Sequence, residues 1–69
     1  MKTAIDQYDS YARDSSVDVS GYYRACVQLM DDQLREQVHS ELAPCSEREF
    51  LERYSELHFA KFNEEFICN

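Results

Sequence analysis

The chain has 69 residues, 14 of them acidic and 7 basic, which gives a formal net charge of −7. This balance argues against direct binding to DNA, RNA or an anionic membrane, because each of these requires basic contacts, yet it permits binding to a protein that itself binds nucleic acid. No apolar run approaches the roughly 20 residues of a membrane span, and no signal peptide is evident, so we expect one acidic helical domain over residues 1–69, located in the cytoplasm.

The first 14 residues, MKTAIDQYDSYARD, are predicted to form a helix. Thr3 with Asp6 three residues later resembles a helix N-cap. The apolar side chains follow at the spacing of an amphipathic helix: Ala4, Ile5, Tyr8, Tyr11 and Ala12. Residues 15–20, SSVDVS, could make a very short strand, but a linker is favoured because a lone strand has no pairing partner.

Residues 21–43 are also predicted to be helical, with Ser20 as the N-cap. One apolar stripe runs through about five turns of this segment: Tyr23, Cys26, Val27, Met30, Leu34, Val38 and Leu42. Asp31 and Asp32 interrupt it, and Asp is more favourable at a cap than inside a helix. The run therefore divides into two helices if it breaks there. Leu29 faces away from the stripe and suggests a second contact surface.

The clearest helix signal lies in residues 46–63. Ser46 and Glu49 form a capping box, in which the Ser46 hydroxyl accepts from the Glu49 backbone N–H and the Glu49 carboxylate accepts from the Ser46 N–H. Pro44 marks a break just before it. An apolar stripe follows at helical spacing: Phe50, Leu51, Tyr54, Leu57 and Phe62.

The remaining segments are a turn at residues 43–46 and a tail at residues 64–69. Phe66 and Ile67 in the tail are apolar, and their exposure to solvent would be unfavourable, so we expect both to pack back onto the helices. The single glycine and single proline point away from an all-β fold. The predicted fold class is therefore all-α, a small bundle of three helices, or four if the middle segment breaks.

No catalytic, metal or cofactor site is expected. His39, Cys45 and His58 lack the spacing of zinc ligands, and the single glycine rules out a Gly-rich phosphate loop. Cys45 precedes a helix N-terminus, a position that favours a reactive thiolate without making it catalytic. The three cysteines are odd in number and widely spaced, which indicates reduced thiols rather than a disulfide framework.

Acidic side chains are the main candidate for a binding surface. Glu49, Glu52 and Glu56 share one helix face, with steps of about 4.5 and 6 Å along the axis, similar to the interval between phosphates on a nucleic-acid strand. A second acidic set lies on the middle segment: Asp31, Asp32, Glu36 and Glu41. Solvated helix faces are often rich in Glu, which keeps small proteins soluble. The scarcity of lysine, with Lys2 and Lys61 alone, favours a role in partner binding.

Two aromatic side chains are candidate partner contacts. Tyr22 adjoins Tyr23, so the two rings must point in different directions, and tyrosine is favoured at protein interfaces. Phe59 lies off the apolar stripe of its helix and close to the acidic face. An exposed Phe beside carboxylates would anchor a protein partner, unless the N-terminal helix or the tail covers it.

Residues 30–66, MDDQLREQVHSELAPCSEREFLERYSELHFAKFNEEF, resemble the small acidic proteins encoded by phages and other mobile elements, and anti-CRISPR proteins in particular. The likeness lies in the short chain, the acidic excess, the compact helices and the lack of a catalytic motif. It implies an inhibitor that docks on a CRISPR effector complex, occupies the basic surface that receives target DNA, and acts as a steric block or a DNA mimic.

The main alternative is a structural or regulatory interaction module without nucleic-acid mimicry. Such a module could form a homodimer through Leu29, Phe59 or the tyrosines, and the expected state of the chain is a monomer or a weak homodimer. A small enzyme or metalloprotein is the third possibility, which metal analysis and alkylation of Cys45 would test.

Overall fold

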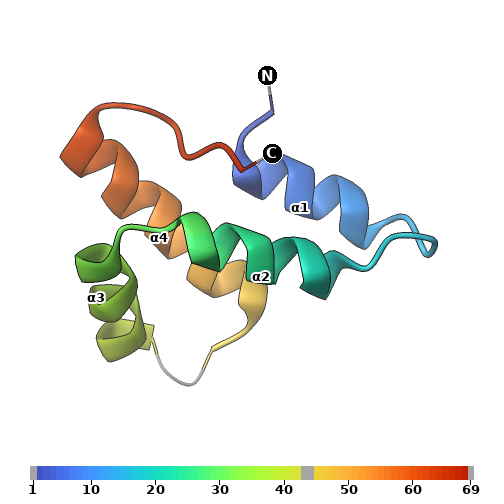
Figure 1. The fold of residues 1–69 in the computed structure, drawn as a ribbon, viewed down its shortest axis with the longest axis horizontal. Coiled ribbons are helices and arrows are strands. Elements are labelled where there is room, and N and C mark those ends of the chain that lie inside the picture. Colours follow the sequence, from blue (N-terminus) through green and yellow to red (C-terminus); the bar gives the residue numbers. More distant parts are fainter. Residues whose placement is uncertain (1, 43–44, 69) are drawn as a thin grey trace.

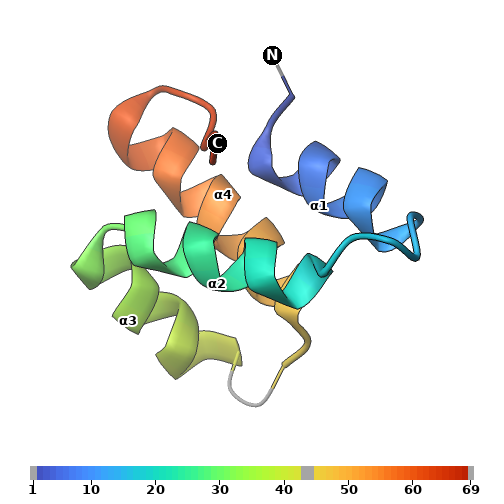
Figure 2. The same ribbon diagram turned by 45° about the vertical axis from the view of Figure 1, so that its right-hand side comes forward.

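The computed structural model describes residues 2–42 and 45–68. Within these ranges it contains four helices and no strand, namely α1 (Ala4–Ala12), α2 (Val19–Leu29), α3 (Asp32–Leu42) and α4 (Glu47–Phe62). The all-α prediction is confirmed, with four helices. α4 crosses behind α2, and α1 and α3 lie on either side of this crossing (Figures 1 and 2). Because α4 contacts each of the other three helices, it forms the centre of the bundle.

The middle segment is two helices, so the alternative with a break at Asp31 and Asp32 is the correct one. Met30 adopts an extended backbone conformation that ends α2. The carboxylate of Asp31 then accepts from the backbone N–H of Leu34 at 3.2 Å, as an N-cap does. The chain turns here because this aspartate satisfies the first turn of α3 better than it would fill a continuous helix.

The N-cap predicted for the middle segment is wrong. Asp18, rather than Ser20, caps α2, and its carboxylate accepts from the backbone N–H of Gly21 at 3.1 Å. A Cβ atom at Gly21 would lie only 2.7 Å from Asp18 Oδ2, so the glycine leaves room for this cap. Ser20 lies inside α2 and its hydroxyl instead donates to Glu47 of α4 at 3.3 Å.

The caps predicted for the first and last helices are confirmed. The Thr3 hydroxyl accepts from the backbone N–H of Asp6 at 3.2 Å. The Ser46 hydroxyl accepts from the backbone N–H of Glu49 at 3.2 Å. The Glu49 carboxylate pairs with the Ser46 hydroxyl at 3.2 Å, rather than with the backbone N–H expected for the second half of the capping box. The turn predicted at residues 43–46 lies partly outside the described residues.

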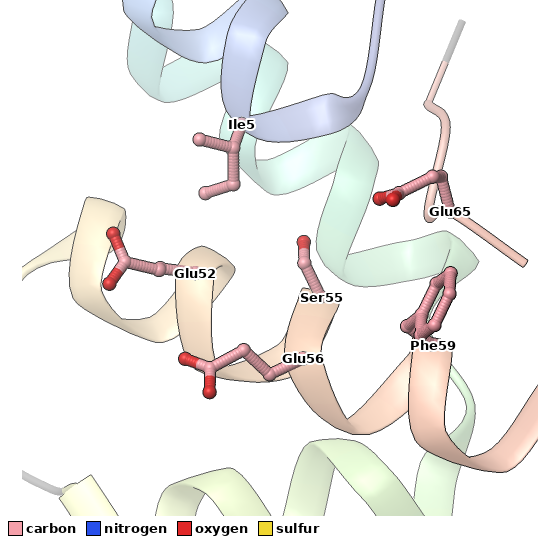
Figure 3. A pocket seen from close by; sticks show the side chains of 6 residues that line it. All are labelled: Ile5, Glu52, Ser55, Glu56, Phe59 and Glu65. Carbon is pink, nitrogen blue, oxygen red and sulfur yellow. The ribbon is translucent and has the colours of Figure 1, made fainter.

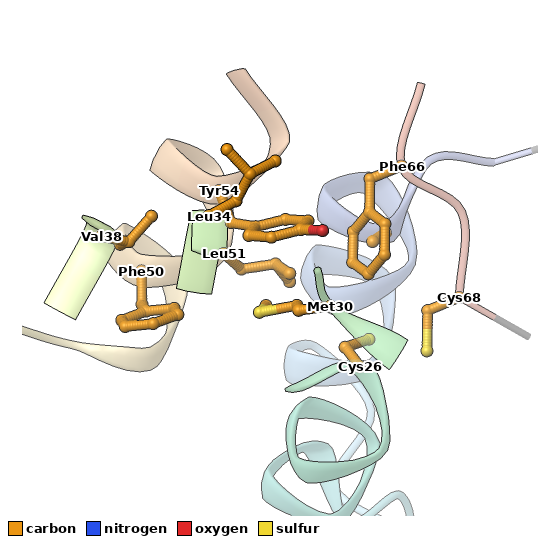
Figure 4. Close-up of a cluster of buried hydrophobic side chains, with 10 residues drawn as sticks. Cys26, Met30, Leu34, Val38, Phe50, Leu51, Tyr54, Phe66 and Cys68 are labelled. Carbon is orange, nitrogen blue, oxygen red and sulfur yellow. The ribbon is translucent and has the colours of Figure 1, made fainter. Parts of the chain in front are cut away.

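The core lies where α4 meets the other elements, and Figure 4 shows its buried side chains. It is made of ten residues: Ala4, Cys26, Met30, Leu34, Val38, Phe50, Leu51, Tyr54, Phe66 and Cys68. The stripe predicted for α4 is confirmed at Phe50, Leu51 and Tyr54. It is wrong at Phe62, which is 42% exposed. Phe62 lies in the last turn of α4, where its ring packs against His58 instead of the core.

The tail after α4 returns to the bundle and closes it (Figure 1). Asn63 ends α4 with a left-handed backbone conformation, φ 57°, which asparagine tolerates better than most residues. The backbone N–H of Ala4 then donates to the carbonyl of Phe66 at 2.9 Å. Phe66 and Cys68 are buried, whereas Ile67 between them is 36% exposed and points to solvent. The packing predicted for Phe66 is confirmed, and that for Ile67 is wrong.

Candidate partner-binding surface

The three glutamates predicted to share a face of α4 are all exposed. Glu52 pairs with Arg48 at 2.6 Å, and Glu56 lies 3.5 Å from Arg53. Glu49 has no cation within 4 Å among the described residues. Arginine side chains of the same helix therefore neutralise part of this face, a feature that net charge alone does not reveal.

The acidic set around α3 is neutralised to a similar extent. Asp32 pairs with Arg35 at 2.6 Å, and Asp31 lies 3.5 Å from Lys61. The backbone N–H of Leu34, with a smaller effect from Lys61, holds the pKa of Asp31 below its usual value. Glu36 is exposed and has no cation within 4 Å in the described part of the chain.

Arg53 joins the two acidic sets. Its guanidinium lies 2.8 Å from Glu41 of α3 and 3.5 Å from Glu56 of α4. The hydrogen bond from Arg53, followed by one from Gln37, holds the pKa of Glu41 below its usual value. The acidic residues of α3 and α4 thus meet at one shared cation rather than lying on unrelated parts of the molecule.

A surface hollow of about 390 Å³ lies between α1, α4 and the tail. Figure 3 shows its lining, which we call the Phe59 hollow and define by six residues: Ile5, Glu52, Ser55, Glu56, Phe59 and Glu65. The sequence predicted three of them, Glu52, Glu56 and Phe59. Ser55 could also have been found, because it lies three residues after Glu52 and four before Phe59, on the same helix face.

The two aromatic candidates have different surroundings. Phe59 is 47% exposed, so neither α1 nor the tail covers it. Tyr22 is half-buried, its ring packs edge-on against Tyr11, and its hydroxyl donates to the carbonyl of Cys68 at 2.9 Å. Burial, the largest cause, raises the pKa of Tyr22. Tyr22 therefore fastens the tail to α2, and a partner contact by this residue stays a prediction.

The two histidines and Cys26 pack against other side chains. The ring of His39 stacks edge-on against Phe50, and His58 lies among the rings of Tyr54, Phe62 and Phe66. Within residues 2–42 and 45–68, no three His, Cys, Asp or Glu side chains come together as metal ligands would. Burial, the largest cause, raises the pKa of the Cys26 thiol to about 12, so this group is not a thiolate at neutral pH.

A second hollow of about 400 Å³ lies between α2, α3 and the start of α4. It is lined by aromatic and cationic side chains: Tyr23, Arg24, Val27, Gln28, Arg35, His39 and Phe50. Its two arginines are paired within the chain, Arg24 with Asp18 at 3.7 Å and Arg35 with Asp32 at 2.6 Å. Among the described residues, no carboxylate lines this hollow. Glu36 and Glu49, two of the carboxylates without a nearby cation, therefore lie on other parts of the surface.

Before any relative is considered, these observations define a small all-α protein with exposed acidic residues on α3 and α4, several of them paired with arginines. None of the helices in the described residues has the length and apolar character needed to cross a membrane. Residues 17–66 match the family model of the anti-CRISPR protein AcrIC5, and the chain belongs to this family. Neither a curated protein nor a solved structure matches the chain.

Membership of this family confirms the resemblance noted in the sequence. The protein is an anti-CRISPR inhibitor, and its partner is a component of a CRISPR–Cas system. The match covers α2, α3 and α4 together with the tail as far as Phe66, so it includes both acidic sets and five of the six residues that line the Phe59 hollow.

Proposed function

We propose that the protein acts as a stoichiometric, non-catalytic inhibitor whose acidic α3 and α4 faces occupy a basic surface of a CRISPR effector complex, in the cytoplasm of the host cell. Target DNA would then be excluded by steric occlusion or by mimicry of its charge. Effector complexes hold nucleic acid in positively charged channels, and an acidic body is steered rapidly towards such a channel.

The observation that carries this proposal is the distribution of the exposed carboxylates. Six of them lie on α3 or α4, namely Asp32, Glu36, Glu41, Glu49, Glu52 and Glu56, and the partly buried Asp31 lies in the turn before α3. Glu36 and Glu49 have no cation within 4 Å in the described residues. These two carboxylates are the ones best placed to pair with a partner's basic groups without first giving up an internal ion pair.

The test compares two double variants with the same net charge. Glu36→Gln with Glu49→Gln removes the two unpaired carboxylates of the proposed surface. Asp6→Asn with Asp14→Asn removes two exposed carboxylates on α1 and in the turn that follows it. Long-range steering depends on net charge, so both variants weaken it equally and differ in where the charge is lost. Asparagine at position 14 keeps an oxygen that can accept from Ser16. The assay is competition with target DNA for the purified effector complex at several salt concentrations.

We expect the Glu36 and Glu49 variant to inhibit about tenfold less well than the wild type, since each exposed ion pair contributes up to about 1 kcal/mol. The control variant should stay within about twofold. The wild type should also lose more affinity with rising salt than the Glu36 and Glu49 variant does. Equal effects of the two variants would show that these carboxylates serve solubility alone, and the proposal would be abandoned.

The alternative, an interaction module that forms a weak homodimer, is favoured by one observation. Leu29 at the end of α2 is 60% exposed, and Phe59 on α4 is 47% exposed. Sedimentation over a range of concentrations separates the alternatives, because a dimer that buries these side chains would gain mass as the concentration rises. A monomer at all concentrations would leave Leu29 and Phe59 available to a different protein.

A further inference from the structure

The Phe59 hollow combines three kinds of lining that together suit one ligand. Ile5 of α1 provides an aliphatic wall, and Phe59 of α4 provides an aromatic ring that is 47% exposed. Three carboxylates also line the hollow, those of Glu52, Glu56 and Glu65 (Figure 3). Its volume of about 390 Å³ lies at the small end of the range for ligand pockets. A ligand here would be small, partly apolar and positively charged.

Ser55 adds to the hollow a polar atom that has no partner within the described residues. Its hydroxyl oxygen is buried and has no hydrogen-bond partner among the described residues. Figure 3 shows this oxygen directed into the hollow, towards the space between Ile5 and Glu65. Buried polar atoms in native proteins nearly always have a partner, and an unpaired one calls for an explanation. A hydrogen-bond donor seated in the hollow would provide that partner.

The charges of the hollow are only partly satisfied within the chain. Arg48 is shared, since it lies 2.8 Å from Asp9 as well as 2.6 Å from Glu52. Arg53 lies closer to Glu41 than to Glu56, at 2.8 against 3.5 Å. Glu65 has no cation within 4 Å in the part of the chain that the structure describes. None of the described residues that line the hollow is basic, so its charge favours a cation.

We propose that the Phe59 hollow receives one arginine side chain of the CRISPR–Cas component, which acts as the anchor of the interface. The guanidinium would stack on Phe59 and donate to Glu65 and to the hydroxyl oxygen of Ser55, while its aliphatic stem packs against Ile5. Arginine fits better than lysine, because its planar group stacks on an aromatic ring and offers five donors to several acceptors at once. This inference rests on the proposed function for the identity of the partner as a basic protein.

The first experiment tests the hollow without any partner. Nα-acetyl-arginine amide is titrated into the isotopically labelled protein, and amide shifts are followed by NMR, with the lysine and norleucine amides as comparisons. We expect saturable shifts at Ser55, Phe59 and Glu65 with the arginine probe, weaker ones with lysine and none with norleucine. Shifts of equal size from norleucine, or no saturable shifts at these residues, would overturn the proposal.

The second experiment uses a matched pair of variants on α4. Phe59→Leu removes the ring of the hollow, and Phe62→Leu makes the same change at an exposed Phe that does not line it. We expect Phe59→Leu to weaken inhibition about three- to tenfold, Phe59→Tyr to restore it, and Phe62→Leu to leave it unchanged, with thermal unfolding unaltered in all three. Equal inhibition by the Phe59→Leu and Phe62→Leu variants would overturn the proposal.

The two proposals fail in different ways. If the arginine probe binds but the variant of Glu36 and Glu49 inhibits as well as its charge-matched control, the acidic-face mechanism is wrong and the hollow stands. If the probe does not bind while the salt-dependent competition behaves as expected, the hollow is wrong and the acidic-face mechanism stands.

Discussion

Replacing Tyr54 with phenylalanine tests the contact that sets the path of the chain between α2 and α3. Tyr54 is 1% exposed, and its hydroxyl accepts from the backbone N–H of Asp31 at 2.7 Å. Asp31 in turn caps α3 through the backbone N–H of Leu34. The substitution keeps the buried ring, so it creates almost no cavity, but it leaves the N–H of Asp31 without its partner.

The expected cost follows from the burial of the two groups. An unsatisfied buried donor costs about 1–3 kcal/mol, and Asp31 is only partly buried, so water can replace part of the bond. We expect a loss of about 1 kcal/mol in the free energy of unfolding, or roughly 4–8 °C in Tm for a domain of this size. Hydrogen exchange should also speed up in α3 more than in α1, because α3 loses the support of its first turn.

The assay is thermal and urea unfolding followed by circular dichroism, with Tyr23→Phe as the control. Tyr23 also packs against the core, through an edge-on contact with Phe50, but its hydroxyl makes no hydrogen bond within the described residues. The control should therefore change Tm little. If the two variants lose the same amount of stability, the bond between Tyr54 and Asp31 does not hold α3 in place and the reasoning fails.

Three further predictions concern the tail, the end of α4 and acid. Phe66→Ala should cost about 3–5 kcal/mol, and since a chain of this length has a total stability of about 3–10 kcal/mol, urea titration should find it largely unfolded. Asn63→Gly should raise Tm slightly and Asn63→Ala should lower it, because glycine adopts the left-handed conformation freely. The hydrogen bonds from Arg48 lower the pKa of Asp9 below its usual 3.8. The resulting stabilisation is present above that pH and is lost as the pH falls below it. Between pH 6 and pH 2, Tm should therefore fall less steeply in the Asp9→Asn variant than in the wild type.

The sequence predicted features that depend on neighbours along the chain. Thr3 and Ser46 were recognisable as caps because the hydroxyl and the N–H it accepts from lie three residues apart. The choice between Asp18 and Ser20 could not be made in this way, since both are good cap residues. A contact across the bundle, between Ser20 and Glu47, accompanies the inclusion of Ser20 in α2.

The same distinction applies to the candidate site. The helical spacing of α4 identified Glu52, Glu56 and Phe59 as residues of one face. Ile5 and Glu65, which complete the hollow, come from α1 and the tail, and no local pattern relates them to α4. The neutralisation of Glu41 by Arg53 was also hidden, because those two residues come from different helices and are 12 apart in sequence.

The bond between Ala4 and Phe66, together with that between Tyr22 and Cys68, brings the two ends of the fold side by side. A short glycine-rich connection between residues 3 and 68 should therefore be compatible with the same packing, and new ends could be opened in the exposed turn at Ser15 and Ser16. Such a circular permutant would carry a fluorophore or a fused protein on the turn between α1 and α2, outside the residues that line the Phe59 hollow.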